Sequence, residues 1–404
     1  MKKRKLIQLV ISGITGILFV SCKTTKAITT TDTAISSQAI ARNAIAYKTT
    51  SIHTLNSSSP LSPIISSVQY SRLQEAITTL KSIRDEDWDV IAYPKASFKQ
   101  GHSAPVISQV KKKLHMLGDL RSDDSSPLFT NELEIAVRDF QKRFGLKEDG
   151  IINKAFIDEI NIPISSRINQ VEVNMERAKT LQMPASGDYL VINVPEFMLR
   201  AYDNGEMAFD MPVIVGKAGS STVLFNDKIK NIVFSPYWNV PPSIVKNEIL
   251  PGMRSEGNGY LAARNMEVVG TEDGLPKIRQ RPGGSNSLGK VKFVFPNSYN
   301  IYLHDTPDKP LFDRVSRSFS HGCIRLKEPG KLAEFLLRNQ KGYDYVKVNE
   351  LMNKGEETSV NLKTPVPVYI VYFTSWVDSD GKLNFRKDIY NHDRKMQTDS
   401  YASK

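Results

Sequence analysis

The chain has 404 residues, of which 24% are charged and 40% hydrophobic, proportions that are ordinary for a globular protein with a sizeable core. Its formal net charge of +11 favours an anionic partner such as a carboxylate-bearing polymer or a membrane surface, although a solvated basic surface would have the same composition. Nucleic acid is disfavoured as a partner, because the lysines and arginines are scattered and accompany no binding motif.

The first 22 residues have the pattern of a secretory signal. Residues 1–5 are mostly basic, and the apolar run from Leu6 to Val20 is too short to remain as a membrane-spanning helix. The run ends at Ser21 and Cys22, a junction that resembles a bacterial lipobox. We therefore expect a lipoprotein signal peptide whose Cys22 becomes lipidated. An ordinary signal peptide with an incidental cysteine is the alternative.

Residues 23–67 are rich in Thr, Ser, Ala and Ile and show no sustained hydrophobic period, so we expect a flexible tether. Apolar residues at helical spacing follow at Leu73, Ile77 and Leu80. They predict a small helical scaffold within residues 68–103.

Residues 104–164 are predicted to form a compact unit of three helices. Two of the helices have an apolar face at helical spacing with a glycine after it as a stop signal, and Asn153 is a candidate N-cap of the third. A connecting helix is expected at residues 165–186. The apolar positions of the three-helix unit are Val106, Val110, Leu114, Leu117, Leu133, Val137, Phe140, Phe144, Phe156, Ile157 and Ile160.

Residues 187–375 consist mainly of short apolar runs that predict β-strands. Asp203, Asn204 and Gly205 have the turn chemistry of a β-hairpin. The strands are expected at residues 189–194, 197–202, 207–215, 229–234, 292–295, 300–304 and 366–374.

Residues 236–281 interrupt this pattern with many Pro, Gly and Asn residues and one expected helix at 243–250. A long excursion between two strands predicts a lid or a binding loop. The fold class is therefore α+β, with a β-rich, sandwich- or barrel-like domain after the small helical domain and a C-terminal extension at residues 376–404.

One stretch of the chain concentrates reactive side chains. The sequence Ser-His-Gly-Cys-Ile-Arg-Leu at residues 320–326 contains the second of only two cysteines, and His304 ends a strand-like run upstream. A thiol beside an imidazole is the minimum for acyl transfer, because the imidazole accepts the thiol proton and the thiolate attacks a carbonyl. Gly322 would permit close backbone approach, so that the N–H groups of Gly322 and Cys323 face the oxyanion. A small buried cysteine in a turn is the alternative.

The spacing of His304 and the Ser-His-Gly-Cys sequence resembles the signature of the L,D-transpeptidases, whose catalytic domain is of the YkuD type. Residues 104–164 resemble a peptidoglycan-binding module, with a domain that serves only for packing as the alternative. The resemblance as a whole runs from Tyr70 to His392. It implies a catalytic domain at residues 187–375 with a capping insertion at 236–281. The sequences that resemble the large periplasmic murein branch of the family are residues 236–244, 292–297 and 303–307.

The resemblance implies a role for each reactive residue. Cys323 would be the nucleophile, and His304 would accept and donate the proton while a main-chain carbonyl orients its ring. His321 would be auxiliary, although its position two residues before Cys323 also makes it the rival base.

Three further residues are expected to bind substrate. Arg325 would bind a carboxylate of the substrate, with an ion pair that fixes the turn as the alternative. Tyr302 and Trp238 are also expected at the substrate, and Trp238 has an alternative use as an anchor of the insertion.

Three other classes of protein remain as alternatives. A zinc site made by His304, His321 and Cys323 would need a further ligand and lacks close metal spacing. A cysteine-dependent wall peptidase or L,D-carboxypeptidase usually has its cysteine before its histidine in the chain, whereas His304 comes first here. A non-catalytic wall-anchoring protein would have no need of an intact Cys–His set.

The resemblance implies a peptidoglycan L,D-transpeptidase that is lipid-anchored and faces the periplasm. Cys323 would attack the carbonyl of the third residue of a tetrapeptide stem and release D-Ala, and an amine acceptor would resolve the acyl-enzyme into a 3-3 cross-link. We expect stem peptides as partners, acylation of Cys323 by carbapenems, no metal or organic cofactor, and a monomer.

Overall fold

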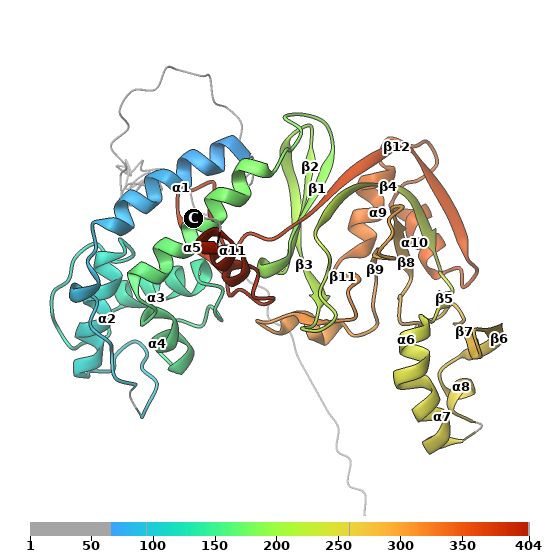
Figure 1. Ribbon diagram of the computed structural model, residues 1–404, viewed down its shortest axis with the longest axis horizontal. Coiled ribbons are helices and arrows are strands. Elements are labelled where there is room, and N and C mark those ends of the chain that lie inside the picture. The colour runs from blue at the N-terminus through green and yellow to red at the C-terminus, as the bar shows by residue number, and fades with distance from the viewer. Residues whose placement is uncertain (1–65, 94, 258, 403–404) are drawn as a thin grey trace, which may run out of the picture. The chain divides into compact units, whose positions relative to one another are not determined.

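The computed structural model describes residues 66–93, 95–257 and 259–402. The expected signal peptide, Cys22 and nearly all of the expected tether lie outside the described residues. Within the described part of the chain, no helix combines the length and the apolar character needed to cross a membrane. Helices dominate the N-terminal part and strands the part that follows (Figure 1).

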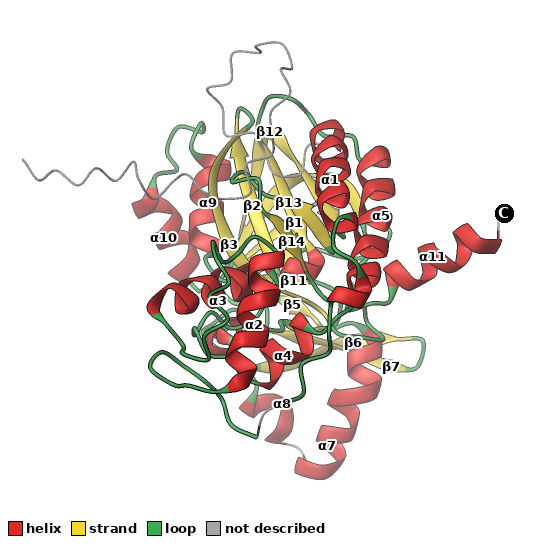
Figure 2. Cartoon of the chain, turned by 90° about the vertical axis from the view of Figure 1, so that its left-hand side faces the viewer, coloured by secondary structure: helices red, strands yellow, loops and turns green. Residues whose placement is uncertain are grey.

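Two helices of the helical unit, α3 and α4, begin at side-chain caps. Thr130 accepts a hydrogen bond from the N–H of Leu133, and Asn153 accepts one from the N–H of Phe156, so the predicted Asn153 cap is confirmed. Helices α1 and α5 pack side by side (Figure 2). The elements are α1 Ser66–Lys81, η1 Asp85–Asp87, α2 Pro105–Met116, α3 Asn131–Arg143, α4 Lys154–Ile160 and α5 Ile164–Thr180.

The core of this helical unit includes residues from the far end of the chain. Val377, Leu383 and Phe385 of the hairpin formed by β13 (Ser375–Val377) and β14 (Leu383–Phe385) are buried together with the apolar faces of α2, α3 and α4. The side chain of Arg143 in α3 also donates to the carbonyl of Leu383. Part of the predicted C-terminal extension at residues 376–404 therefore packs into the core of the helical unit.

The part of the chain after the helical unit forms a nine-stranded sheet in the order β10-β3-β11-β9-β8-β4-β12-β1-β2. Because β3 also pairs with β2, the two ends of the sheet meet, and the predicted barrel-like α+β fold is confirmed. The strands are β1 Tyr189–Asn193, β2 Met198–Asp203, β3 Glu206–Gly216, β4 Phe225–Phe234, β8 Val291–Val294, β9 Leu303–His304, β10 Ser318–Ser320, β11 Ile324–Leu326 and β12 Thr358–Val371.

The predicted hairpin is formed by β2 and β3. Its turn residues Asn204 and Gly205 both have positive φ, 51° and 88°, as a two-residue hairpin turn requires. Two helices that the sequence patterns did not predict, α9 Pro329–Leu337 and α10 Tyr345–Asn353, cover the sheet and contribute Leu332 and Val348 to its core. The remaining elements are η2 Val194–Glu196, η4 Lys309–Asp313 and α11 His392–Ala402.

The insertion between β4 and β8 is a small subdomain with its own core. A helical run from Pro242 to Glu256 is longer than the helix expected there, and a three-stranded sheet, which we did not predict, accompanies it. Val245, Ile249, Tyr260 and Ile278 are buried between helix and sheet. The elements are β5 Trp238–Asn239, α6 Pro242–Ile244, η3 Val245–Ile249, α7 Leu250–Glu256, α8 Gly259–Ala263, β6 Met266–Glu272 and β7 Leu275–Gln280.

Candidate active site

Three neighbouring strands place the candidate catalytic residues. β11 runs parallel to β9 with Arg325 opposite His304, and β8 runs antiparallel to β9 with Lys292 opposite His304. Because side chains alternate across a strand, Leu303 and Ile324 enter the core, while His304 and Arg325 face the other side. The register therefore brings an imidazole, a guanidinium and an ammonium group abreast, beside Cys323.

Cys323 ends the turn that joins β10 to β11. Inside this turn, Ser320 Oγ donates to the carbonyl of Cys323 and accepts the N–H of Gly322 at 3.1 Å. Gly322 has a φ of 114°, which disfavours any residue with a Cβ.

The expectation that the Gly322 N–H faces an oxyanion is not met in this geometry, because that donor is used inside the turn. The next N–H, that of Cys323, has no hydrogen-bond partner among the described residues. The Cys323 N–H is therefore the donor that this turn leaves available to a developing oxyanion.

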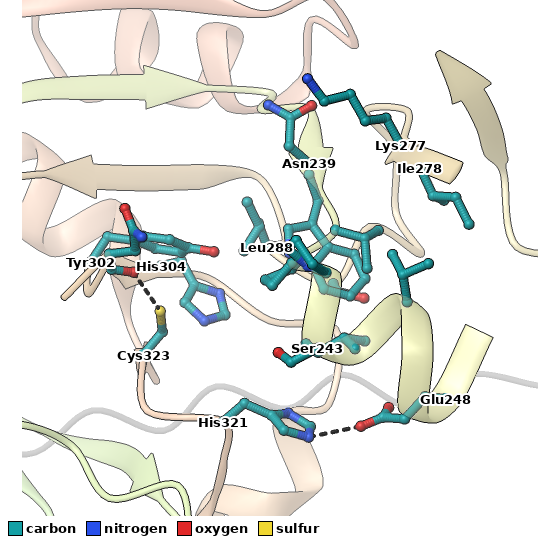
Figure 3. A pocket seen from close by; sticks show the side chains of 18 of the residues that line it. Asn239, Ser243, Glu248, Lys277, Ile278, Leu288, Tyr302, His304, His321 and Cys323 are labelled. Atoms are coloured by element: carbon teal, nitrogen blue, oxygen red, sulfur yellow. Dashed lines mark hydrogen bonds and ion pairs between the residues drawn. The ribbon is translucent and has the colours of Figure 1, made fainter. Parts of the chain in front are cut away.

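His304 is buried, and its Nδ1 faces the main-chain carbonyl of Asp305. A carbonyl only accepts, so this contact assigns the proton to Nδ1 and leaves Nε2 as an acceptor. The imidazole and the thiol of Cys323 lie on the same wall of the pocket (Figure 3), and Sγ is 3.6 Å from the carbonyl oxygen of Asn300. This tautomer is the one that a general base requires, and no acidic side chain is needed to fix it.

The electrostatics of the site keep both partners neutral at rest. Burial lowers the pKa of His304 to about 3, and the positive charges of Arg325, Lys292 and Lys309 lower it further than the Asp305 carbonyl raises it. Burial also raises the pKa of Cys323 above that of an ordinary thiol, against the opposing effects of Tyr302, Lys292 and Arg325.

Tyr302 lies against both the base and the nucleophile. Its ring centroid is 5.6 Å from that of His304, and the ammonium group of Lys292 lies 4.2 Å from its centroid. Burial raises the pKa of Tyr302 far above its ordinary value, and the proximity of Cys323 adds to the effect, so the Tyr302 hydroxyl remains a hydrogen-bond donor. Burial lowers the pKa of Lys292, and the negative charge that Cys323 acquires on ionisation would oppose this shift.

A cavity of about 950 Å³ is lined by Lys292, Tyr302, His304, Cys323 and Arg325. The sheet supplies one wall with Tyr302, His304 and Cys323, and the insertion supplies the opposite wall with residues such as Asn239 and Ile278 (Figure 3). The volume is sufficient for a peptide-sized ligand.

Trp238 lines the same cavity while it packs against the core of the insertion. Both uses that the sequence left open for this residue are compatible with its position.

His321 points away from His304 and toward the insertion. Its Nε2 is 2.8 Å from Glu248 Oε1 of η3 and 3.5 Å from the Nζ of Lys217, and its side chain is 39% exposed. The contact with Glu248 therefore links the turn that contains Cys323 to the insertion, and neither partner of His321 is the Cys323 thiol.

Arg325 forms an ion pair with Asp308 at 2.9 Å, which corresponds to the structural alternative for this residue. Its Nε is buried, and no hydrogen-bond partner is present for it among the described residues. Asp308 is largely exposed, so a substrate carboxylate can compete for the guanidinium.

Three contributors to the site were not predicted from the sequence: Lys292, Asn300 and Glu248. Lys292 alternates with the buried positions Val291 and Phe293 of β8, and this pattern was the one available signal that it leaves the core. Within the described part of the chain, no three His, Cys, Asp or Glu side chains converge as a metal site.

Two domain families match this chain. Residues 187–368 match the L,D-transpeptidase catalytic domain, YkuD, and residues 103–160 match the "Putative peptidoglycan binding domain". The nine-stranded part of the chain, which contains the cavity described above, is therefore the region similar to the L,D-transpeptidase catalytic domain. The helical unit before it contains the region similar to the peptidoglycan-binding domain.

A curated "Putative L,D-transpeptidase" of Haemophilus influenzae is 29% identical over 254 residues, which cover 58% of this chain. The match covers 51% of that relative, so the chain spans about half of its length.

Two solved structures are similar at low sequence identity. The L,D-transpeptidase of Xylanimonas cellulosilytica (residues 123–326) is 13% identical with a TM-score of 0.22, and the match covers 69% of this chain and all of that one. An L,D-transpeptidase from Mycobacterium smegmatis is also 13% identical with a TM-score of 0.25, and the match covers 46% of this chain and 59% of that one.

Proposed function

We propose that this protein is a peptidoglycan L,D-transpeptidase with Cys323 as its nucleophile and His304 as its general base. The observation that carries the proposal is the strand register that sets His304 beside the Cys323 turn, with Nδ1 occupied by a carbonyl and Nε2 left to accept a proton. The YkuD match and the cavity between sheet and insertion support the same reaction class.

The reaction starts from a neutral thiol. His304 Nε2 takes the proton of Cys323 as sulfur bonds to the carbonyl carbon of the third residue of a tetrapeptide stem. The Cys323 N–H and the Tyr302 hydroxyl donate to the oxyanion. Collapse breaks the amide C–N bond, and His304 returns the proton to the departing D-Ala amine.

The second half of the reaction consumes the thioester. The amine of another stem gives a proton to His304 and attacks the acyl carbon, which forms the new amide and releases Cys323. Water at the same position gives the tripeptide, the product of L,D-carboxypeptidase activity. We propose that the insertion at residues 236–281 favours the amine by limiting the access of water. The cationic groups Arg325 and Lys292 suit the carboxylates of stem peptides.

Location is part of the proposal. The sequence of residues 1–22 supports a lipoprotein that faces the periplasm, with Cys22 as its anchor. Cys22→Ser is expected to move the protein from the membrane fraction to the soluble fraction.

Mass spectrometry of disaccharide-tetrapeptides incubated with the enzyme tests the proposal. The wild type should give cross-linked dimer and free D-Ala, and Cys323→Ala should give neither while it unfolds like the wild type. A carbapenem should add its mass to the wild type at Cys323. Product formation by Cys323→Ala would contradict the assignment of the nucleophile.

A further inference from the structure

Tyr390 connects the C-terminal segment to the active-site turn. The residue lies beyond the matched catalytic domain, which ends at residue 368. It is nevertheless 8% exposed, belongs to the core of the catalytic sheet and stacks on Tyr372 with ring centroids 5.7 Å apart. Its main-chain N–H donates to the hydroxyl of Tyr372 at 2.9 Å, so Tyr390 is held both by its backbone and by its ring.

The hydroxyl of Tyr390 holds the loop that follows β3. It donates to the carbonyl of Gly216 and accepts the N–H of Thr222 at 3.3 Å. The loop folds tightly on itself, because a Cβ at Gly216 would lie 2.1 Å from the carbonyl oxygen of Ser220. Gly216 therefore cannot be replaced without opening the loop.

Thr222 extends this network to the residue before the nucleophile. Its Oγ1 accepts the N–H of Gly216 at 2.9 Å and donates to the carbonyl of Gly322 at 2.8 Å. The side chain is 1% exposed, so both bonds are shielded from water.

The carbonyl that Thr222 holds belongs to the same peptide unit as the N–H of Cys323. A trans peptide is planar, and its C=O and N–H point in opposite directions. With the carbonyl of Gly322 bound to Thr222, the Cys323 N–H must point away from Thr222. This is the N–H that has no partner among the described residues.

We propose that Thr222 and Tyr390 are positioning residues that set the plane of the Gly322–Cys323 peptide and so aim its N–H at the oxyanion. The inference rests on the proposed function, since it concerns acyl transfer by Cys323. It places one determinant of the reaction outside the residues that match the catalytic domain.

Two reactions of the same thiol separate positioning from a general structural role. Acylation by a β-lactam or a tetrapeptide donor passes through an oxyanion, whereas alkylation by iodoacetamide does not. Removal of an oxyanion donor commonly costs ~10²–10³ in rate, and misorientation is expected to cost less. For Thr222→Val we expect acylation to slow by ~10–10² in kcat with little change in KM, while alkylation stays within about two-fold.

Conservative variants keep the test decisive. Thr222→Ser retains a hydroxyl at the same place and should recover most of the acylation rate. Tyr390→Phe loses only its hydroxyl and should slow acylation by about ten-fold through the loosened loop. Tyr369→Phe, the same chemical change on β12, should leave both reactions unchanged.

The outcomes are distinguishable. Provided that a carbapenem adds to Cys323 of the wild type, two results would overturn the positioning role. One is an equal loss of alkylation and acylation in Thr222→Val and Tyr390→Phe, and the other is no loss of either reaction. If the wild type itself were not acylated at Cys323, the proposed function would fall and this inference with it.

Discussion

The neutral resting state of Cys323 and His304 leads to a prediction about the thiol itself. In many thiol enzymes an imidazolium stabilises the thiolate, and loss of the histidine then raises the thiol pKa. Here the buried His304 lies beside three cations, and the imidazolium is disfavoured. We therefore expect His304→Gln to change the pKa of Cys323 little, although it removes the base and slows acylation by ~10²–10⁴.

The magnitudes decide between a neutral pair and an ion pair. Lowering the pKa of His304 from 6.5 to about 3 disfavours the imidazolium by roughly 5 kcal/mol. Attraction between a thiolate and an imidazolium ~4 Å apart offsets roughly 4 kcal/mol of this at an effective dielectric constant near 20. Burial also raises the pKa of Cys323 and so disfavours the thiolate, and the neutral pair therefore remains the favoured state.

The assay is a titration of the thiolate absorbance in the ultraviolet, in a Cys22→Ser background so that Cys323 is the single thiol. Cys323→Ala in the same background supplies the blank. The thiol should titrate above the pKa of an ordinary cysteine both in the wild type and in His304→Gln, because burial raises its pKa in either case. A midpoint near neutrality, or a rise of about two or more pH units in His304→Gln, would refute the reasoning, since either result requires a pre-formed ion pair.

Three further predictions concern stability and the insertion. The pKa of His304 in the folded protein, about 3, lies below its ordinary value of 6.5, so the free energy of unfolding should fall as the pH drops below 6.5, by up to about 1.4 kcal/mol per pH unit. Urea unfolding at a series of pH values should show a weaker pH dependence of this free energy for His304→Gln. An identical pH dependence would contradict the buried neutral imidazole. Glu248→Gln should raise the ratio of tripeptide to cross-linked dimer by no more than about five-fold, because a half-exposed ion pair contributes up to ~1 kcal/mol. The control Glu272→Gln removes an ion pair that lies wholly within the insertion and should leave this ratio unchanged. Equal effects of the two substitutions would reject a link through His321. Replacing residues 236–281 by a short Gly/Ser loop should leave acylation by a β-lactam largely intact, and it should shift the products formed from tetrapeptides toward the tripeptide. Loss of β-lactam acylation in a variant that still folds would instead show that the insertion is part of the catalytic apparatus.

The sequence was informative where local chemistry determines the structure. The turn of Asn204 and Gly205 specified a hairpin, and the Asn153 cap started a helix where expected. The presence of His304 and Cys323 in one cavity could also be expected, because a strand-end histidine and a glycine-containing turn lie within twenty residues of each other in the sequence.

Contacts that depend on register or on distant segments were not accessible in this way. Lys292 reaches His304 only because β8 and β9 align in one register out of several, and no local pattern selects that register. Glu248 meets His321 because the insertion folds as its own small domain. The Gly322 N–H likewise donates to the hydroxyl of Ser320, and residue type alone does not specify this hydrogen bond.

The cations around His304 have two effects that act together. In the empty site, Arg325, Lys292 and Lys309 make the imidazolium costly, so the thiol keeps its proton. A substrate carboxylate bound to Arg325 or Lys292 would neutralise part of that positive charge and raise the pKa of His304, which makes transfer of the Cys323 proton easier. The same residues that suit an anionic stem peptide would then increase the basicity of His304 when that peptide is present, and the nucleophile would become reactive mainly in the substrate complex.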